Sequence, residues 1–194
     1  MKRFLPHIAL TLVVVQLLIM LVSWLLSAAF PTSGIRSLLS SEGLRWLMGH
    51  FSQLLATPLL AWLLLCAMAW GCLLRSGLLV RPTNYRERRA QLMALLLLAV
   101  IVGVMLLLTV VPHAVLLSAV GGLWPSPFSA SLVPVVAFSI TLVSAFYGLA
   151  SGRFENISAV YDAVLFGIRQ GAPLFLFYVL VIQIYESFMF VLSI

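Results

Sequence analysis

Glu186 is the only carboxylate inside a long apolar segment of the sequence, and Gln183 precedes it by one helical turn. An ionisable group held in hydrocarbon costs free energy, and it therefore indicates a function by default. The chemistry would be proton or cation binding by the carboxylate, with the Gln183 amide as its companion. Because Glu186 lies only eight residues before the end of the sequence, a hydrated carboxylate at the level of the lipid headgroups is the alternative.

A metal or haem site would need histidines or cysteines that converge. His7 lies at the start of the first apolar segment and His113 at the end of the third, so most of a bilayer separates them, and His50 lies in a connecting stretch. Cys66 and Cys72 are six residues apart and face different sides of one helix. We therefore predict no metal, no cofactor and no disulfide. The sequence also has no Walker loop, no Ser/His/Asp arrangement and no paired carboxylates, so we predict that it is not an enzyme.

Four arginines form the densest basic cluster in the sequence: Arg81, Arg86, Arg88 and Arg89. Anionic lipid headgroups are a natural partner for such a cluster. The alternative is that the arginines only determine the topology of the neighbouring helices. A nucleic acid partner is not predicted, despite the net charge of +6, because the basic residues are scattered between apolar runs.

Small residues recur every four positions at Ser144, Gly148 and Gly152. On a helix this spacing places them on one face, where they permit close approach of another helix. The pattern predicts a helix-packing face, with a second copy of the chain or another membrane protein as the partner. The alternative is that these small residues simply face lipid.

The elements that position these residues must lie in a membrane. The 194 residues are 63% apolar and 8% charged, whereas about 25% is charged in an ordinary soluble domain. No Asp, Glu, Lys or Arg occurs from Ala90 to Gly152, and a soluble surface of that kind would aggregate. Five apolar segments are long enough to span a bilayer, and lipid requires each to be helical. They are residues 5–30, 54–74, 92–112, 132–152 and 172–192.

The predicted fold is therefore all-α, a single polytopic membrane domain over residues 1–194. Two short amphipathic helices are expected at the membrane interface, over residues 41–53 with Ser41 and Glu42 at the start and over residues 158–170 with Ser158 as the cap. Pro58, Pro134 and Pro173 are each expected at a helix start, and the Gly- and Pro-rich residues 121–128 in a turn. Within one copy of the chain we expect no central resting place for a polar solute and no polar cavity.

The basic residues also predict an orientation. If the N-terminus is cytoplasmic, nine Lys and Arg residues, including Lys2 and Arg3, lie inside and only Arg36 and Arg45 lie outside. The C-terminus is then on the outer side of an inner (cytoplasmic) membrane. The first apolar run is too long for a cleavable signal peptide, so we expect it to be retained as the first span.

Two blocks of sequence resemble the AbgT family of p-aminobenzoyl-glutamate transporters. Residues 36–46 and 75–79 are similar to the outer loop and second helix of that family, and Pro6-His7 fits its opening helix. Residues 125–128, 132–134 and 145–148, with the approach to Gln183, resemble its central region. The similarity follows the family's order but lacks its re-entrant hairpins and its last helices. The resemblance implies that hairpins and broken helices bind substrate and coupling ions in that family, and no position of this sequence matches them.

The resemblance implies a shortened AbgT-like protein without a complete substrate site. The first hypothesis is an accessory or scaffold subunit that packs against itself or another transporter. The second is a minimal oligomeric transporter of p-aminobenzoyl-glutamate-like, aromatic or dicarboxylate solutes, with Glu186 as its titratable group. The third is an inactive remnant of a longer ancestor.

Overall fold

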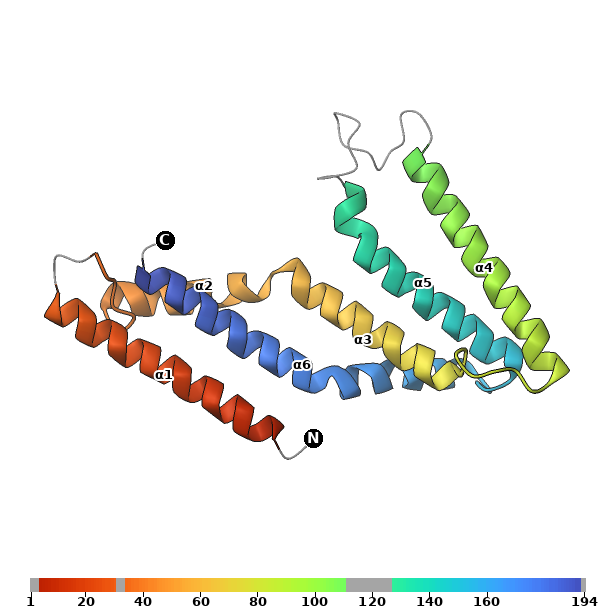
Figure 1. The fold of residues 1–194 in the computed structure, drawn as a ribbon, viewed down its shortest axis with the longest axis horizontal. Helices are drawn as coiled ribbons and strands as arrows, with labels where there is room; N and C mark the ends of the chain where they lie inside the picture. Colours follow the sequence, from red (N-terminus) through yellow and green to blue (C-terminus); the bar gives the residue numbers. More distant parts are fainter. Residues whose placement is uncertain (1–3, 31–33, 111–126, 193–194) are drawn as a thin grey trace. The chain divides into compact units, whose positions relative to one another are not determined.

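All regular secondary structure in the described part of the chain is helical, which confirms the predicted all-α fold. The computed structural model describes residues 4–30, 34–110 and 127–192. Six helices lie within these residues (Figure 1): α1 (Leu5–Ala29), α2 (Ser41–Leu55), α3 (Pro58–Ser76), α4 (Tyr85–Val110), α5 (Pro127–Ser151) and α6 (Ile157–Leu192). Lys2, Arg3, His113 and most of the predicted turn at 121–128 lie outside the described residues.

Five helices are long and apolar enough to cross a membrane, as the sequence predicts. They are Leu5–Ala29, Pro58–Ser76, Tyr85–Thr109, Ser131–Ser151 and Ile157–Leu192. At 1.5 Å per residue, the 19 residues of α3 extend about 28 Å and the 25 residues of α1 about 37 Å. These lengths match a hydrocarbon core of about 30 Å. The chain thus has the architecture of a multi-pass membrane protein embedded in a lipid bilayer.

The predicted helix over residues 41–53 is present as α2, and it begins at Ser41 as the sequence predicts. The Ser40 hydroxyl, not that of Ser41, accepts the Gly43 N–H at 3.0 Å, and Glu42 lies in the first turn. The apolar residues Leu44, Met48 and Phe51 are exposed. An exposed apolar stripe on an otherwise polar helix is what an interfacial helix presents to a bilayer.

The predicted break between an inner amphipathic helix and the last span is wrong. Residues 158–170 and 172–192 belong to one helix of 36 residues, α6, which continues through Pro173. A proline removes one backbone hydrogen bond, and helices in membranes tolerate that loss. The Asn156 side chain caps this helix by accepting the Ala159 N–H at 3.0 Å, so the predicted cap, Ser158, is also wrong. At about 54 Å, α6 is longer than the hydrocarbon core is thick.

Of the three prolines predicted at helix starts, only Pro58 begins a helix. Pro134 lies inside α5, because that helix begins seven residues earlier at Pro127. Pro134 and Pro173 are thus tolerated inside helices, as a bilayer allows when the backbone groups freed by a proline find other partners.

The chain divides into two compact units. The terminal unit comprises Met1–Ala61 and Ala172–Ile194, and the central unit comprises Trp62–Gly171. In the terminal unit, α1 runs beside the last part of α6 (Figure 1), and the Gln16 amide donates to the Ser187 hydroxyl at 2.8 Å. Two backbone N–H groups of the segment before α2 donate hydrogen bonds to α1 and α6. The Leu38 N–H donates to the Ser23 hydroxyl, and the Arg36 N–H donates to the Val191 carbonyl at 3.2 Å.

The central unit has two contact regions. Helices α4 and α5 pack along each other (Figure 1), with Ala90 and Ala94 against Val143 and Tyr147. Helix α3 crosses the first part of α6 at two glycines, Gly71 and Gly167. A Cβ at either position would collide with backbone atoms of the other helix, so glycine is required for this close approach.

Candidate functional site

An open pocket of about 620 Å³ lies in the terminal unit, between the segment before α2, α2 itself and the end of α6. Its lining combines charged, aromatic and small side chains: Arg36, Glu42, Arg45, Trp46, Gly49, His50, Glu186, Met189 and Phe190. The expectation that one copy of the chain walls no polar cavity is therefore wrong. The pocket lies at the last two turns of α6 and not at the middle of the helix. The expectation that the chain has no central site for a polar solute is a separate one, and this pocket does not contradict it.

Helical spacing places the lining residues on one face of each helix. Glu42, Trp46 and His50 follow each other at intervals of four residues on α2. On α6, Glu186 is followed after three and four residues by Met189 and Phe190. The two faces meet, because the rings of Trp46 and Phe190 stack with centroids 4.5 Å apart and an interplanar angle of 24°.

Aromatic contacts continue from this stack to both sides. The His50 imidazole stacks on Trp46 with centroids 5.5 Å apart. The Arg36 guanidinium lies 5.9 Å from the centroid of the Phe190 ring, within range of a cation–π interaction. The pocket therefore has an aromatic wall that extends from α2 to α6.

The charges of the pocket are only partly paired. Arg36 and Glu42 form an ion pair at 3.8 Å, but their side chains are 53% and 71% exposed, and such pairs contribute about 0–1 kcal/mol. Among the described residues, neither Arg45 nor Glu186 has an ion-pair partner. The two guanidinium groups and two carboxylates sum to a formal charge of zero.

Of the predicted pair of Glu186 and Gln183, only Glu186 lines the pocket, and the pairing itself stays a prediction. Glu186 lines the pocket, whereas Gln183 is half-buried and does not. The structure instead brings Glu186 to the same pocket as Arg45, Trp46 and His50, which sequence analysis did not select. The proton- or ion-linked role of Glu186 stays a prediction.

The other titratable residues considered from the sequence lie elsewhere. His7 is exposed at the start of α1, and Cys66 and Cys72 are free thiols in α3. Within residues 4–30, 34–110 and 127–192, no three His, Cys, Asp or Glu side chains are grouped so that they could hold a metal ion.

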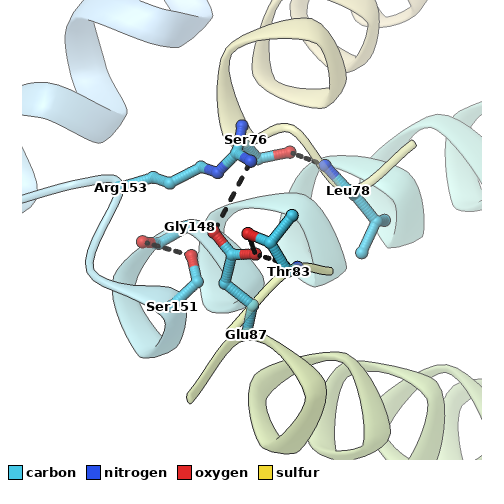
Figure 2. Close-up of polar contacts among 7 residues, drawn as sticks. All are labelled: Ser76, Leu78, Thr83, Glu87, Gly148, Ser151 and Arg153. Atoms are coloured by element: carbon cyan, nitrogen blue, oxygen red, sulfur yellow. Dashed lines mark hydrogen bonds and ion pairs between the residues drawn. The ribbon is translucent and has the colours of Figure 1, made fainter. Parts of the chain in front are cut away.

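The arginine cluster lies at one end of the central unit, where the turn after α3 meets the turn after α5. Figure 2 shows Arg153 directed at Glu87, with 3.7 Å between their charged atoms, while Glu87 also accepts the N–H of Thr83 at 2.8 Å. Arg86 donates from Nε to the Ala150 carbonyl at 3.1 Å. The Arg89 guanidinium lies 5.5 Å from the centre of the Tyr85 ring. Arg81 and Arg88 are exposed.

The three small residues at four-residue spacing contact other parts of the central unit. Ser144 is fully buried, and its hydroxyl has no partner among the described residues. A Cβ at Gly148 would overlap the Phe154 ring, and one at Gly152 would lie 2.9 Å from the Arg86 guanidinium carbon. The glycines thus accommodate side chains of the same chain, and the predicted packing against a second protein stays a prediction.

Comparison with known protein families, with curated proteins and with solved structures finds no match for this chain. The resemblance to AbgT transporters, the three hypotheses that follow from it and the predicted membrane and orientation therefore stay predictions. The helices themselves support a more general conclusion. The chain is a multi-pass membrane protein, with a charged and aromatic pocket at the end of its last helix.

Proposed function

We propose that this chain binds a small zwitterion with an aromatic body in the pocket formed by α2 and the end of α6. The observation that carries the proposal is that two opposite charges line the pocket and neither has an ion-pair partner within the described residues. Arg45 from α2 and Glu186 from α6 line the same pocket, and neither forms an ion pair within the described residues. A ligand with a carboxylate and an ammonium group would neutralise both.

The charge balance favours a zwitterion over a dicarboxylate. A dicarboxylate such as a p-aminobenzoyl-glutamate-like solute meets two guanidinium groups but also the carboxylates of Glu42 and Glu186. Like charges in one site oppose binding. A zwitterion gains from both signs, so it is the class of solute that a pocket of zero formal charge attracts best.

The aromatic wall would bind the aromatic body of the ligand. The Trp46 and Phe190 rings are already stacked, and a third ring or an ammonium group can pack on such a surface. The volume of about 620 Å³ is within the range of about 300–1,000 Å³ typical of small-molecule sites. An aromatic amino acid satisfies size, charge and shape together.

Three related compounds test the proposal on the purified full chain in lipid nanodiscs. Tryptophan has both charges, tryptamine lacks the carboxylate and indole-3-propionate lacks the ammonium group. Titration calorimetry should show tighter binding of tryptophan than of either analogue. A charge-assisted hydrogen bond contributes about 1.5–3 kcal/mol, which corresponds to a difference of roughly tenfold or more.

Two variants assign the charges. Glu186→Gln should abolish the preference for tryptophan over indole-3-propionate, and Arg45→Gln should abolish the preference over tryptamine. Glu155→Gln and Arg169→Gln are matched controls, because both residues are exposed in the central unit and do not line the pocket. Equal affinity for all three compounds in the unmodified protein would refute the zwitterion proposal.

A further inference from the structure

A second charged cavity lies in the central unit, at the start of α4. This α4–α5 groove has a volume of about 340 Å³ and is lined by Tyr85, Arg86, Arg89, Ala90, Met93 and Ala150. Two of its six lining residues are arginines, and none is acidic. The groove therefore attracts an anion.

Contacts within the chain hold both arginines in place. Arg86 donates from Nε to the Ala150 carbonyl, and its guanidinium packs on Gly152, where a Cβ would lie 2.9 Å from the guanidinium carbon. In the described part of the chain, the terminal nitrogens of Arg86 have no hydrogen-bond partner. Arg89 packs on the Tyr85 ring. Guanidinium groups fixed in this way can bind phosphate with less loss of side-chain entropy.

The nearby carboxylate does not neutralise the groove. Glu87 forms an ion pair with Arg153 and accepts the N–H of Thr83 (Figure 2), and it is absent from the lining of the groove. Arg81 and Arg88 are exposed in the same segment and add to the positive potential without lining the groove.

An exposed apolar stripe continues from the groove along α4. Met93, Leu96 and Val100 follow Arg89 after four, seven and eleven residues, which places all four on one helix face. Their side chains are 53%, 64% and 55% exposed. A hydrocarbon chain can lie along this stripe, whereas a free phosphate ion has nothing to contact there.

From this arrangement we infer that the α4–α5 groove binds an anionic phospholipid. Its phosphate pairs with Arg86 and Arg89, and one acyl chain lies along Met93, Leu96 and Val100. The site separates the four arginines of the cluster into two classes. Two bind the headgroup, and Arg81 and Arg88 contribute only long-range attraction.

Native mass spectrometry of the full chain in detergent tests this inference, with phosphatidylglycerol as the probe and phosphatidylcholine of the same chain length as the neutral reference. The variant Arg86→Gln/Arg89→Gln should bind phosphatidylglycerol at least tenfold more weakly than the unmodified protein. The matched control is Arg81→Gln/Arg88→Gln, which loses the same charge from the same segment and should change the affinity less than threefold. Equal weakening by the two double variants would overturn the inference.

Two further measurements separate the remaining outcomes. If the double variant fails to fold, as judged by circular dichroism, Arg89→Gln alone replaces it. Arg89 is exposed and packs on the exposed Tyr85 ring, so this single variant should fold and should still weaken binding at least threefold. Inorganic phosphate and glycerol phosphate should compete with phosphatidylglycerol only at concentrations at least a hundredfold higher. Competition at equal concentrations would show a phosphate site and overturn the assignment to a lipid.

Discussion

Replacing Gly71 with alanine tests whether the crossing of α3 and α6 depends on the absence of a side chain. A Cβ at Gly71 would overlap the backbone of Gly167 and the carbonyl of Ala163. Backbone atoms cannot rotate away as a side chain would, so the two helices must move apart. The displacement would loosen the adjacent cluster of Cys72, Phe154 and Ala163.

The size of the effect follows from two opposing terms. Forcing extra atoms into a packed contact costs about 1–3 kcal/mol. Alanine also favours helix over glycine by about 1 kcal/mol. Gly103→Ala in α4 has only the second term, because a Cβ there would meet nothing within 4 Å. The difference between the two variants therefore isolates the cost of the overlap. The free energy of unfolding of Gly71→Ala should therefore lie about 1–3 kcal/mol below that of Gly103→Ala, since the gain in helix propensity is common to both variants.

Reversible unfolding in mixed detergent micelles, followed by circular dichroism as the fraction of sodium dodecyl sulfate rises, measures this difference. The cation–π contact of Arg75 with the Phe166 ring, at 4.6 Å, spans the same two helices and should weaken with them. Adding Gly167→Ala to Gly71→Ala should cost less than the sum of the single changes, because one separation relieves both overlaps. Equal stability of Gly71→Ala and Gly103→Ala would refute the close crossing.

Two other substitutions probe a pocket and a turn. Gly49→Leu should lower the affinity for tryptophan at least tenfold in titration calorimetry without lowering the unfolding midpoint, because Gly49 lines the pocket and its Cβ would enter open space. Gly77→Ala should destabilise the central unit by about 1–2 kcal/mol in the same detergent titration. The reason is that Gly77 has a φ of +71° and that a Cβ there would overlap the Arg153 guanidinium. An unchanged unfolding midpoint would contradict this.

The helices of the chain were predictable because hydrocarbon admits few alternatives. An apolar run of about 20 residues in lipid has to satisfy its backbone internally, so length and composition suffice to find α1, α3, α4 and α5. The single helix α6 was not predictable by the same rule. The polar residues Asp162 and Arg169 and the proline at 173 suggested an interfacial helix followed by a new span, whereas the backbone remains helical through all of them.

The pocket could be predicted only in part, through Glu186. A carboxylate in an apolar run is conspicuous in sequence. The α2 residues Arg45, Trp46 and His50 are not, because a polar helix face that lines a pocket has the same residue pattern as one that faces water. The proximity of α2 to the end of α6 depends on contacts between residues far apart in the chain, such as the stack of Trp46 on Phe190. One local signal was available, the spacing of Glu42, Trp46 and His50 at intervals of four residues.

The two charged cavities differ in their charge and in the ligand proposed for each, so the variants of one cavity serve as controls for the other. The pocket at α2 and α6 holds two positive and two negative side chains, and the positive-inside rule, which counts only Lys and Arg, gives no account of the two carboxylates. The groove at α4 and α5 holds only positive charge, which topology and lipid binding both explain. Glu186→Gln should therefore leave phosphatidylglycerol binding unchanged, and Arg86→Gln/Arg89→Gln should leave tryptophan binding unchanged. If either variant altered both ligands, its effect would be a general loss of structure, and neither cavity could be assigned a ligand from that variant.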